Sequence, residues 1–154
     1  MKLAQHCLSA IPLAAAGYAA AGGSWAGAFA AGISSVLIDL DHVTDYVLYN
    51  RGWGGVQDFF KSCEEGKLDR LYLVFHSFEF VIFLWLLVGF GIAAPWGVGL
   101  TIGVSGHMLL DWFGNRHIVQ PSFYWLWFRA VNGFDGNRLY RVPPGSLATA
   151  RVRN

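Results

Sequence analysis

From Leu3 to Ile38 the chain contains no lysine, arginine, aspartate or glutamate. A helix crosses a membrane in about 20 apolar residues, so this uncharged stretch is too long for a single crossing. Gly22-Gly23-Ser24 lies within it and is typical of a turn. The stretch therefore predicts two membrane helices, over about residues 4–21 and 25–49. Lys2 followed by an apolar, alanine-rich run also resembles a signal peptide, although Pro12 interrupts that run.

Composition supports a membrane protein. Residues of the AVILMFWYC set make up 55% of the 154 residues, and charged residues make up 14%, against about 25% in soluble domains. Mean hydropathy is +0.40 and the net charge is +1. These values exclude a disordered chain, a basic nucleic-acid-binding domain and an ordinary soluble enzyme. We expect an all-α integral membrane bundle of about four transmembrane helices plus one short interfacial helix.

The third and fourth membrane helices are predicted over about residues 71–92 and 96–114, on either side of a turn at 94–97. Lysine and arginine are absent from the turns at 22–24 and 93–97, but several lie in the 50–70 loop and near the C-terminus. Basic residues stay on the cytoplasmic side of a membrane. We therefore predict a multi-pass protein of the inner (plasma) membrane with both termini in the cytoplasm.

An aromatic segment follows the fourth predicted helix. Pro121 can begin a helix, and five aromatic residues lie between Phe123 and Phe128. Together with Arg129 at its end, this segment predicts a helix over about 121–132 in the inner membrane interface, with a lid over a site as the alternative. We expect a transmembrane metal-binding domain over 1–135 and a peripheral tail over 136–154.

The predicted membrane helices contain an unusual number of polar side chains. Five of the ten acidic residues and four of the five histidines lie inside them, with no lysine or arginine there to pair with them. The acids are Asp39, Asp41, Asp45, Glu79 and Asp111, and the histidines are His6, His42, His76 and His107. Each buried aspartate costs about 2.5–3.5 kcal/mol. Protonation of the acids offsets that cost, as does a divalent metal, whose binding contributes about 10–16 kcal/mol.

Depth and spacing favour the metal. With a rise of about 1.5 Å per residue, every predicted helix places its polar groups in one layer on the cytoplasmic side. The pairs His76–Glu79, Asp39–His42, Asp41–Asp45 and His107–Asp111 are three or four residues apart, so each pair can share a helix face. Asp39 and Asp41 lie about 200° apart on an ideal helix and can face one site only where the helix is irregular.

The order of these motifs resembles that of the predicted membrane-bound metal-dependent hydrolases, a family with a DNA-damage-inducible bacterial inner-membrane member. The matching residues are His6, Asp39-Leu40-Asp41-His42, His76-Ser77 and Gly106-His107 with Asp111. The resemblance covers about residues 1–130. It implies a helical membrane fold with a metal site, distantly similar to zinc-dependent phospholipase C. Ile38 and Leu71 stand where the family has a proline and a histidine.

We therefore expect a metal-dependent hydrolase that acts on an ester or phosphoester, such as that of a lipid, at the cytoplasmic face. One or two Zn²⁺ ions, with Mn²⁺ or Fe²⁺ as alternatives, would activate water. The expected ligands are His6, Asp39, Asp41, His42, His76, His107 and Asp111. The expected catalytic residues are Asp41, as a bridge between two ions, and Glu79, as general base or as an outer-shell partner of a histidine.

Two other functions remain open at this point. One is a non-catalytic, metal-stabilised subunit of a membrane complex, which Leu71 in place of the family histidine favours. The other is a metal or proton carrier that uses the same acids as a pathway. Expected partners are membrane lipids, together with either another membrane protein or a second copy of the chain. No nucleic acid is expected.

Overall fold

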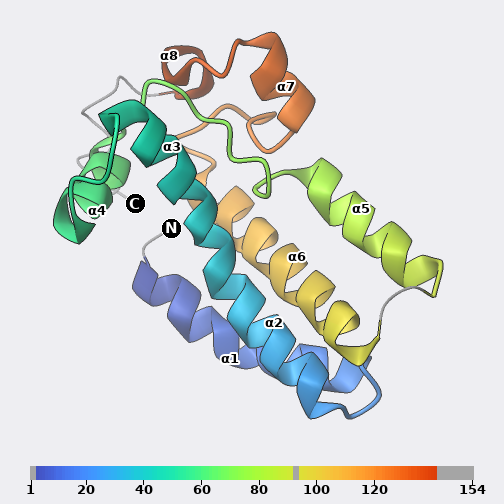
Figure 1. Ribbon diagram of the computed structural model, residues 1–154. Helices are drawn as coiled ribbons and strands as arrows, with labels where there is room; N and C mark the ends of the chain where they lie inside the picture. The colour runs from blue at the N-terminus through green and yellow to red at the C-terminus, as the bar shows by residue number, and fades with distance from the viewer. Residues whose placement is uncertain (1–2, 92–93, 142–154) are drawn as a thin grey trace. The chain divides into compact units, whose positions relative to one another are not determined.

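The computed structural model describes residues 3–91 and 94–141, and its regular secondary structure is helical (Figure 1). The all-α prediction is confirmed. In chain order the elements are α1 (Leu3–Ala20), α2 (Trp25–Leu37), a 3₁₀ turn η1 (Ile38–Leu40), α3 (Asp41–Asn50), α4 (Val56–Glu65), α5 (Phe78–Gly89), α6 (Pro95–Asn115), α7 (Leu126–Val131) and α8 (Gly136–Leu139).

The chain divides into two compact units, each built from separate segments. Unit 1 comprises residues 1–38 and 76–114, and it contains α1, α2, α5 and all but the last residue of α6. Unit 2 comprises residues 39–75 and 115–154, and it contains α3, α4, α7 and α8. The predicted polar residues are therefore distributed over two bodies, which are described separately below.

Small residues bring the helices of unit 1 close together. Along α6, Gly99 lies against the backbone of Gly27 in α2, and Gly103 lies against the backbone of Ala31 one turn further on. A Cβ atom at either glycine would overlap the facing main chain. The Ser34 hydroxyl also donates to the Leu100 carbonyl at 3.2 Å. This is the small-residue packing typical of membrane helices, and it sets α2 and α6 side by side in parallel.

Helix α1 returns alongside α2 in the opposite direction, after a turn at residues 21–24 (Figure 1). Gly17 of α1 lies close to Gly27 and Ala31 of α2, and Leu13 of α1 lies against Gly106 of α6. The first turn of α1 therefore lies towards the C-terminal half of α6. That placement positions His6 for the site described below.

Unit 1 exposes many large apolar side chains and buries several polar groups among the apolar residues of its interior. Its exposed residues include Leu8, Ile11, Phe29, Ile33, Phe83, Leu86, Leu109 and Phe113. Its buried polar residues are His6, Ser35, His76, Ser77, Thr101, His107 and Asp111. Exposed apolar surface on this scale is typical of a membrane or partner contact.

One helical stretch in the described part of the chain, Trp25–Asn50, has the length and apolar composition needed to cross a membrane. It comprises α2, η1 and α3. Helix α5 is apolar but has only 12 residues, whereas α1 and α6 are rich in alanine and glycine and therefore less apolar. Helices do occupy all four predicted spans, but four crossings of a membrane stay a prediction.

The prediction for the third span was wrong at its start. Helix α5 begins at Phe78, because Ser77 adopts an extended conformation and its hydroxyl accepts the Phe80 amide as an N-cap. Residues 71–75 instead run irregularly within unit 2, where the Leu71 amide donates to the Phe134 carbonyl at 2.9 Å. Their apolar character reflects burial in a core, since Leu71 and Leu73 are almost fully buried.

Unit 2 also contains a helix where a loop was expected. Helix α4 occupies half of the 50–70 region, and Asp58 on it accepts a 2.5 Å hydrogen bond from the Tyr46 hydroxyl of α3. The rings of Tyr46, Trp53 and Phe59 pack together beside this bond. The contact holds α4 against α3.

The aromatic segment differs from its prediction as well. Pro121 begins a turn, and α7 starts only at Leu126. Tyr124 is buried and accepts a hydrogen bond from the Asn115 side chain, and Arg129 is completely buried rather than placed at an interface. The first residues of the expected tail, 136–141, include α8 and belong to unit 2, and residues 142–154 lie outside the described residues.

Candidate metal centre

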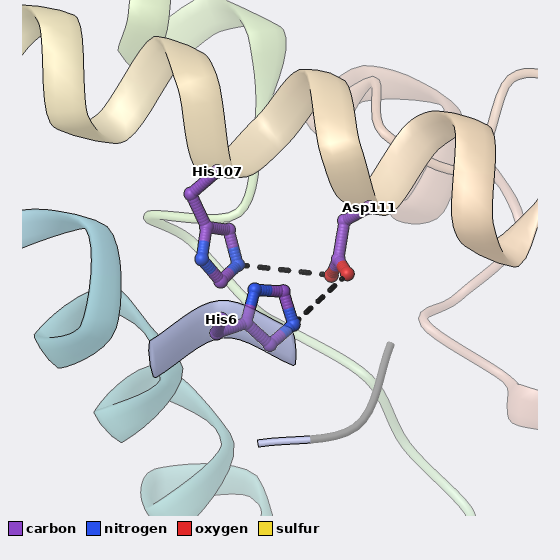
Figure 2. A group of neighbouring side chains, drawn as sticks. All are labelled: His6, His107 and Asp111. Carbon is purple, nitrogen blue, oxygen red and sulfur yellow. Dashed lines mark ion pairs between the residues drawn. The ribbon is translucent and has the colours of Figure 1, made fainter. Parts of the chain in front are cut away.

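Two histidines and one aspartate converge inside unit 1. His6 comes from the first turn of α1, and His107 and Asp111 lie one turn apart on α6. The His6 Nε2 atom lies 3.3 Å from Asp111 Oδ1, and the His107 Nε2 atom lies 3.7 Å from Asp111 Oδ2. Figure 2 shows the two rings and the carboxylate pointing toward one another. The three residues are 3%, 0% and 5% exposed, so bulk water does not solvate them.

The main chain of α2 fixes the orientation of His107. Its Nδ1 atom lies 2.7 Å from the Ser35 carbonyl oxygen, which can only accept a hydrogen bond. The proton of neutral His107 is therefore on Nδ1, and the lone pair on Nε2 faces Asp111. Ser35 lies in the last turn of α2, where carbonyls lose their partners within the helix. Ser35 and His107 also continue the register of the Gly27–Gly99 and Ala31–Gly103 contacts.

A third histidine, His76, completes the cluster in unit 1. Its Nε2 atom lies 3.2 Å from His107 Nε2, and the two rings meet edge to face. The rings of His6 and His107 are stacked at 4.2 Å. Unit 1 therefore brings together four of the seven predicted ligands. His76 precedes α5, however, so it does not share a helix face with Glu79 as predicted.

The spacing of these atoms fits a metal ion. Ligands at about 2.0–2.1 Å from a tetrahedral Zn²⁺ ion lie about 3.3–3.4 Å from one another, close to the observed 3.2, 3.3 and 3.7 Å. A direct hydrogen bond between an imidazolium and a carboxylate would be shorter, about 2.7–2.9 Å. A set of imidazole nitrogens and one carboxylate suits Zn²⁺ and other first-row transition metals.

The three residues together could hold a metal ion. His6, His107 and Asp111 each offer one ligand atom, and His76 lies beside His107. The buried His6 Nδ1 atom, which has no hydrogen-bond partner among the described residues, is on the side of the ring opposite Nε2 and does not face Asp111.

The remaining predicted ligands, Asp39, Asp41 and His42, lie in unit 2, where Asp41 and the neighbouring acid Asp45 bind main-chain amides. Asp41 Oδ2 accepts the Phe75 amide at 2.7 Å, and Asp45 Oδ2 accepts the Leu73 amide at 3.3 Å. Asp39 and His42 are half-buried on η1 and α3. The 3₁₀ turn at Ile38–Leu40 supplies the helix irregularity that Asp39 and Asp41 required. Metal ligation by Asp39, Asp41 and His42 stays a prediction, as does catalysis by Asp41.

Three further groups are Glu79, which was predicted, and the Ser35 carbonyl and Arg129, which the sequence analysis missed. Glu79 is half-buried in the first turn of α5, and its role as general base stays a prediction. The Ser35 carbonyl was missed, although small residues at every fourth position from Gly27 to Ser35 and from Gly99 to Gly103 signal the close approach that delivers it. Buried Arg129 was also missed, because its sequence neighbours are typical of an interface.

Comparison with known proteins adds no further indication: no family model, curated protein or solved structure matches the chain. The geometry of the site is therefore the main indication of function.

Proposed function

We propose that this chain is a membrane-embedded metal-dependent hydrolase whose ion is held by His6, His107 and Asp111. The observation that carries the proposal is the convergence of both Nε2 atoms on the two oxygens of Asp111, with His107 oriented by the Ser35 carbonyl. A backbone carbonyl behind a ligating histidine is the usual outer-shell arrangement at metal sites. Two histidines and one carboxylate are also a ligand set of catalytic zinc sites, which keep one position open.

Hydrolysis would use the position that catalytic zinc sites leave open for water. His6, His107 and Asp111 would hold the ion, which would supply an activated water as a nucleophile at neutral pH. His76 Nε2 lies 3.2 Å from the unprotonated His107 Nε2, so it donates a hydrogen bond there and places a donor at the edge of the centre. Asp111 turns a separate oxygen toward the Nε2 atom of each histidine and supplies the negative charge that favours a cation. An ester or phosphoester is the substrate class that such a nucleophile cleaves.

The surface of unit 1 supports a location in the membrane. Its helices expose leucine, isoleucine and phenylalanine outward, and they enclose the histidines and Asp111. The distribution of lysine and arginine favours four crossings with both termini in the cytoplasm, and so a multi-pass protein of the inner membrane that contacts lipids. Reporter fusions after Gly66 and after Asn154 should both give a cytoplasmic signal. A periplasmic signal at either position would contradict this topology.

The proposal agrees with the resemblance of the motifs to the predicted membrane-bound metal-dependent hydrolases. His6, His76, His107 and Asp111 are all positions of that motif, and all four meet in unit 1. Leu71, which stands where the family has a histidine, is buried in the core of unit 2.

A second function, a non-catalytic metal-stabilised membrane subunit, is favoured by one specific observation. If His76 Nε2 binds the same ion, the ion has four protein ligands, as in structural zinc sites. The two functions differ in the fourth position of the ion. An exchangeable water there supports the hydrolase, and a nitrogen from His76 supports the structural subunit.

Elemental analysis of the purified full chain tests the metal site that both functions need. Wild-type protein should contain about one zinc, manganese or iron ion per chain, and His107→Ala should lose it. His117→Ala is the matched control, because His117 is exposed and lies outside unit 1. Metal well below one ion per chain in the wild type, with no rise in Tm on adding Zn²⁺ or Mn²⁺, would contradict the proposal and leave protonated acids as the explanation.

A further inference from the structure

Helix α4 of unit 2 has an apolar face that the rest of the unit covers only in part. The Phe59 ring packs against the buried ring of Tyr46, with 5.4 Å between the ring centroids. Val56 and Phe60 lie one turn apart on the adjoining strip of the helix, and they remain 60% and 40% exposed. Trp53, in the linker before α4, is 54% exposed, and its ring centroid lies 6.0 Å from that of Phe59. Trp53, Val56 and Phe60 are here called the α4 patch.

Polar residues line the other exposed side of α4. Gln57, Lys61 and Glu64 are exposed there, so the exposed surface of the helix divides along its axis into an apolar strip and a polar strip. This division is typical of a helix that lies in the plane of a membrane interface, with its apolar strip against the acyl chains. Tryptophan is enriched at that depth, and the Lys61 side chain is long enough to reach the headgroups. With 10 residues, α4 is about 15 Å long, which is too short to cross a bilayer.

Two hydrogen bonds tie this region to the second half of α3. The Tyr46 hydroxyl donates to Asp58 of α4 at 2.5 Å and accepts from the Gly54 amide of the linker at 3.2 Å. Tyr46 lies about 6 Å along the helix axis from Asn50, the last residue of α3. Asn50 also ends the one helical stretch in the described residues that is long and apolar enough to cross a membrane. If that stretch crosses, α4 is held close to the membrane surface at which it ends, and the lysines and arginines of residues 50–70 place that end in the cytoplasm.

The size of the α4 patch favours lipid over protein as its partner. Large side chains bury at most about 150–250 Å² each, so three that are half exposed offer about 300 Å² in total. A stable protein interface buries about 800 Å² on each partner. A bilayer has no such minimum, because the rest of the chain already holds the helix at its surface.

We propose that α4 is an interfacial helix that docks through the α4 patch onto the cytoplasmic surface of the bilayer, with its axis in the membrane plane. The inference rests on the membrane location in the proposed function, and it needs neither the metal nor hydrolysis. It assigns the interfacial role to α4, rather than to residues 121–132, for which that role was predicted from the sequence.

Spin-label accessibility tests this docking on the full chain in nanodiscs of phosphatidylcholine and phosphatidylglycerol. Oxygen concentrates among acyl chains, whereas a chelated nickel complex stays in water. In a Cys7→Ser, Cys63→Ala background, a label at Val56→Cys should collide more with oxygen than with nickel. A label at Lys61→Cys, on the polar strip, is the matched control and should show the reverse. If that background does not fold, a benzophenone side chain placed at Phe60 in the otherwise wild-type chain should crosslink to lipid.

The possible failures are distinguishable. A label at Ile33→Cys, an exposed apolar position of α2 in unit 1, reports on the membrane location by itself and should collide mainly with oxygen. Collisions mainly with nickel at Val56, together with oxygen at Ile33, would overturn the inference and leave the proposed function intact. Collisions mainly with nickel at both positions would refute the proposed membrane location and the inference with it. Low accessibility to both reagents at Val56, or benzophenone crosslinks to protein, would place a second copy or another protein on the α4 patch and would also overturn the inference.

Discussion

The two units contain the same kinds of polar residue and use them differently. In unit 1, Asp111 meets two histidine rings, at distances longer than a strong hydrogen bond. In unit 2, Asp41 and Asp45 accept backbone amides of a neighbouring segment. Unit 1 therefore collects nitrogen and oxygen lone pairs around one point, whereas unit 2 uses its carboxylates to hold main chain.

This difference bears on how freely each acid can bind a metal ion. A carboxylate that already accepts an amide has part of its bonding capacity occupied, and a metal would have to compete for it. A carboxylate surrounded by imidazole nitrogens is stabilised most when the group binds a cation. Sequence position inside a predicted membrane helix does not distinguish the two cases, because Asp45 and Asp111 both lie in such helices and both are buried.

The largest expected effect comes from removing the shared acid of unit 1. Asp111→Ala should lower metal affinity by more than about 100-fold, since loss of an outer-shell partner alone costs about 10–100-fold. Stabilisation by metal should disappear with it, which amounts to about 2.7 kcal/mol at a metal concentration of 100 times Kd. Titration with Zn²⁺, followed by Tm, measures both. Asp69→Ala, at an exposed position in unit 2, should change neither.

A smaller effect should follow from a change in the packing that sets up the centre. A Cβ atom at Gly103 would overlap the Ala31 carbonyl, so Gly103→Ala should cost about 1–3 kcal/mol of stability. Metal affinity should fall as well, because Ser35 and His107 lie one turn further along the same contact. Gly89→Ala is the control: nothing lies within 4 Å of its Cβ position, so stability should stay the same or rise slightly. Chemical denaturation and metal titration of both variants check this prediction, and equal behaviour of the two would contradict it.

The smallest expected effect concerns the start of α5, next to His76. Ser77→Ala removes the hydroxyl that accepts the Phe80 amide and should cost about 1 kcal/mol. Ser24→Ala is a matched control, since Ser24 occupies the same position before α2 but makes no side-chain cap bond. Thermal unfolding should separate the two variants. If both lost the same stability, the cap at Ser77 would not explain where α5 begins.

Much of the fold could be predicted from local signals. The uncharged run and its Gly22-Gly23-Ser24 turn locate α1 and α2, and the turn at 94–97 locates the start of α6. The start of α5 was misplaced because an apolar run does not reveal whether it is buried by a helix or by an extended segment. The N-cap at Ser77 was the available signal, since serine before an apolar run is typical of a helix start.

The site could be predicted in part. His107 and Asp111 are one turn apart, so their proximity follows from helix geometry alone. His6 and His76 reach them from other elements, and only the packing of α1 against α6 and the chain that leads into α5 bring them close. The division into two units could not be predicted, because the boundary after Ile38 falls inside a continuous helical stretch. Arg129 was misassigned for a similar reason, since its burial depends on Leu73, which is distant in sequence.

The separation of His6 and Asp111 along the chain has a consequence for the order of events during synthesis. About 105 residues lie between them, and a ribosome adds about 5–20 residues per second. The first histidine therefore waits for about 5–20 seconds before its carboxylate partner has been made. During that interval α1 and α2 can pair through Gly17 and Ala31, but the ion has no complete set of ligands. In the proposed metal centre, loading would therefore be a late step in biogenesis, because the three ligands are complete only after Asp111 of α6 has been made.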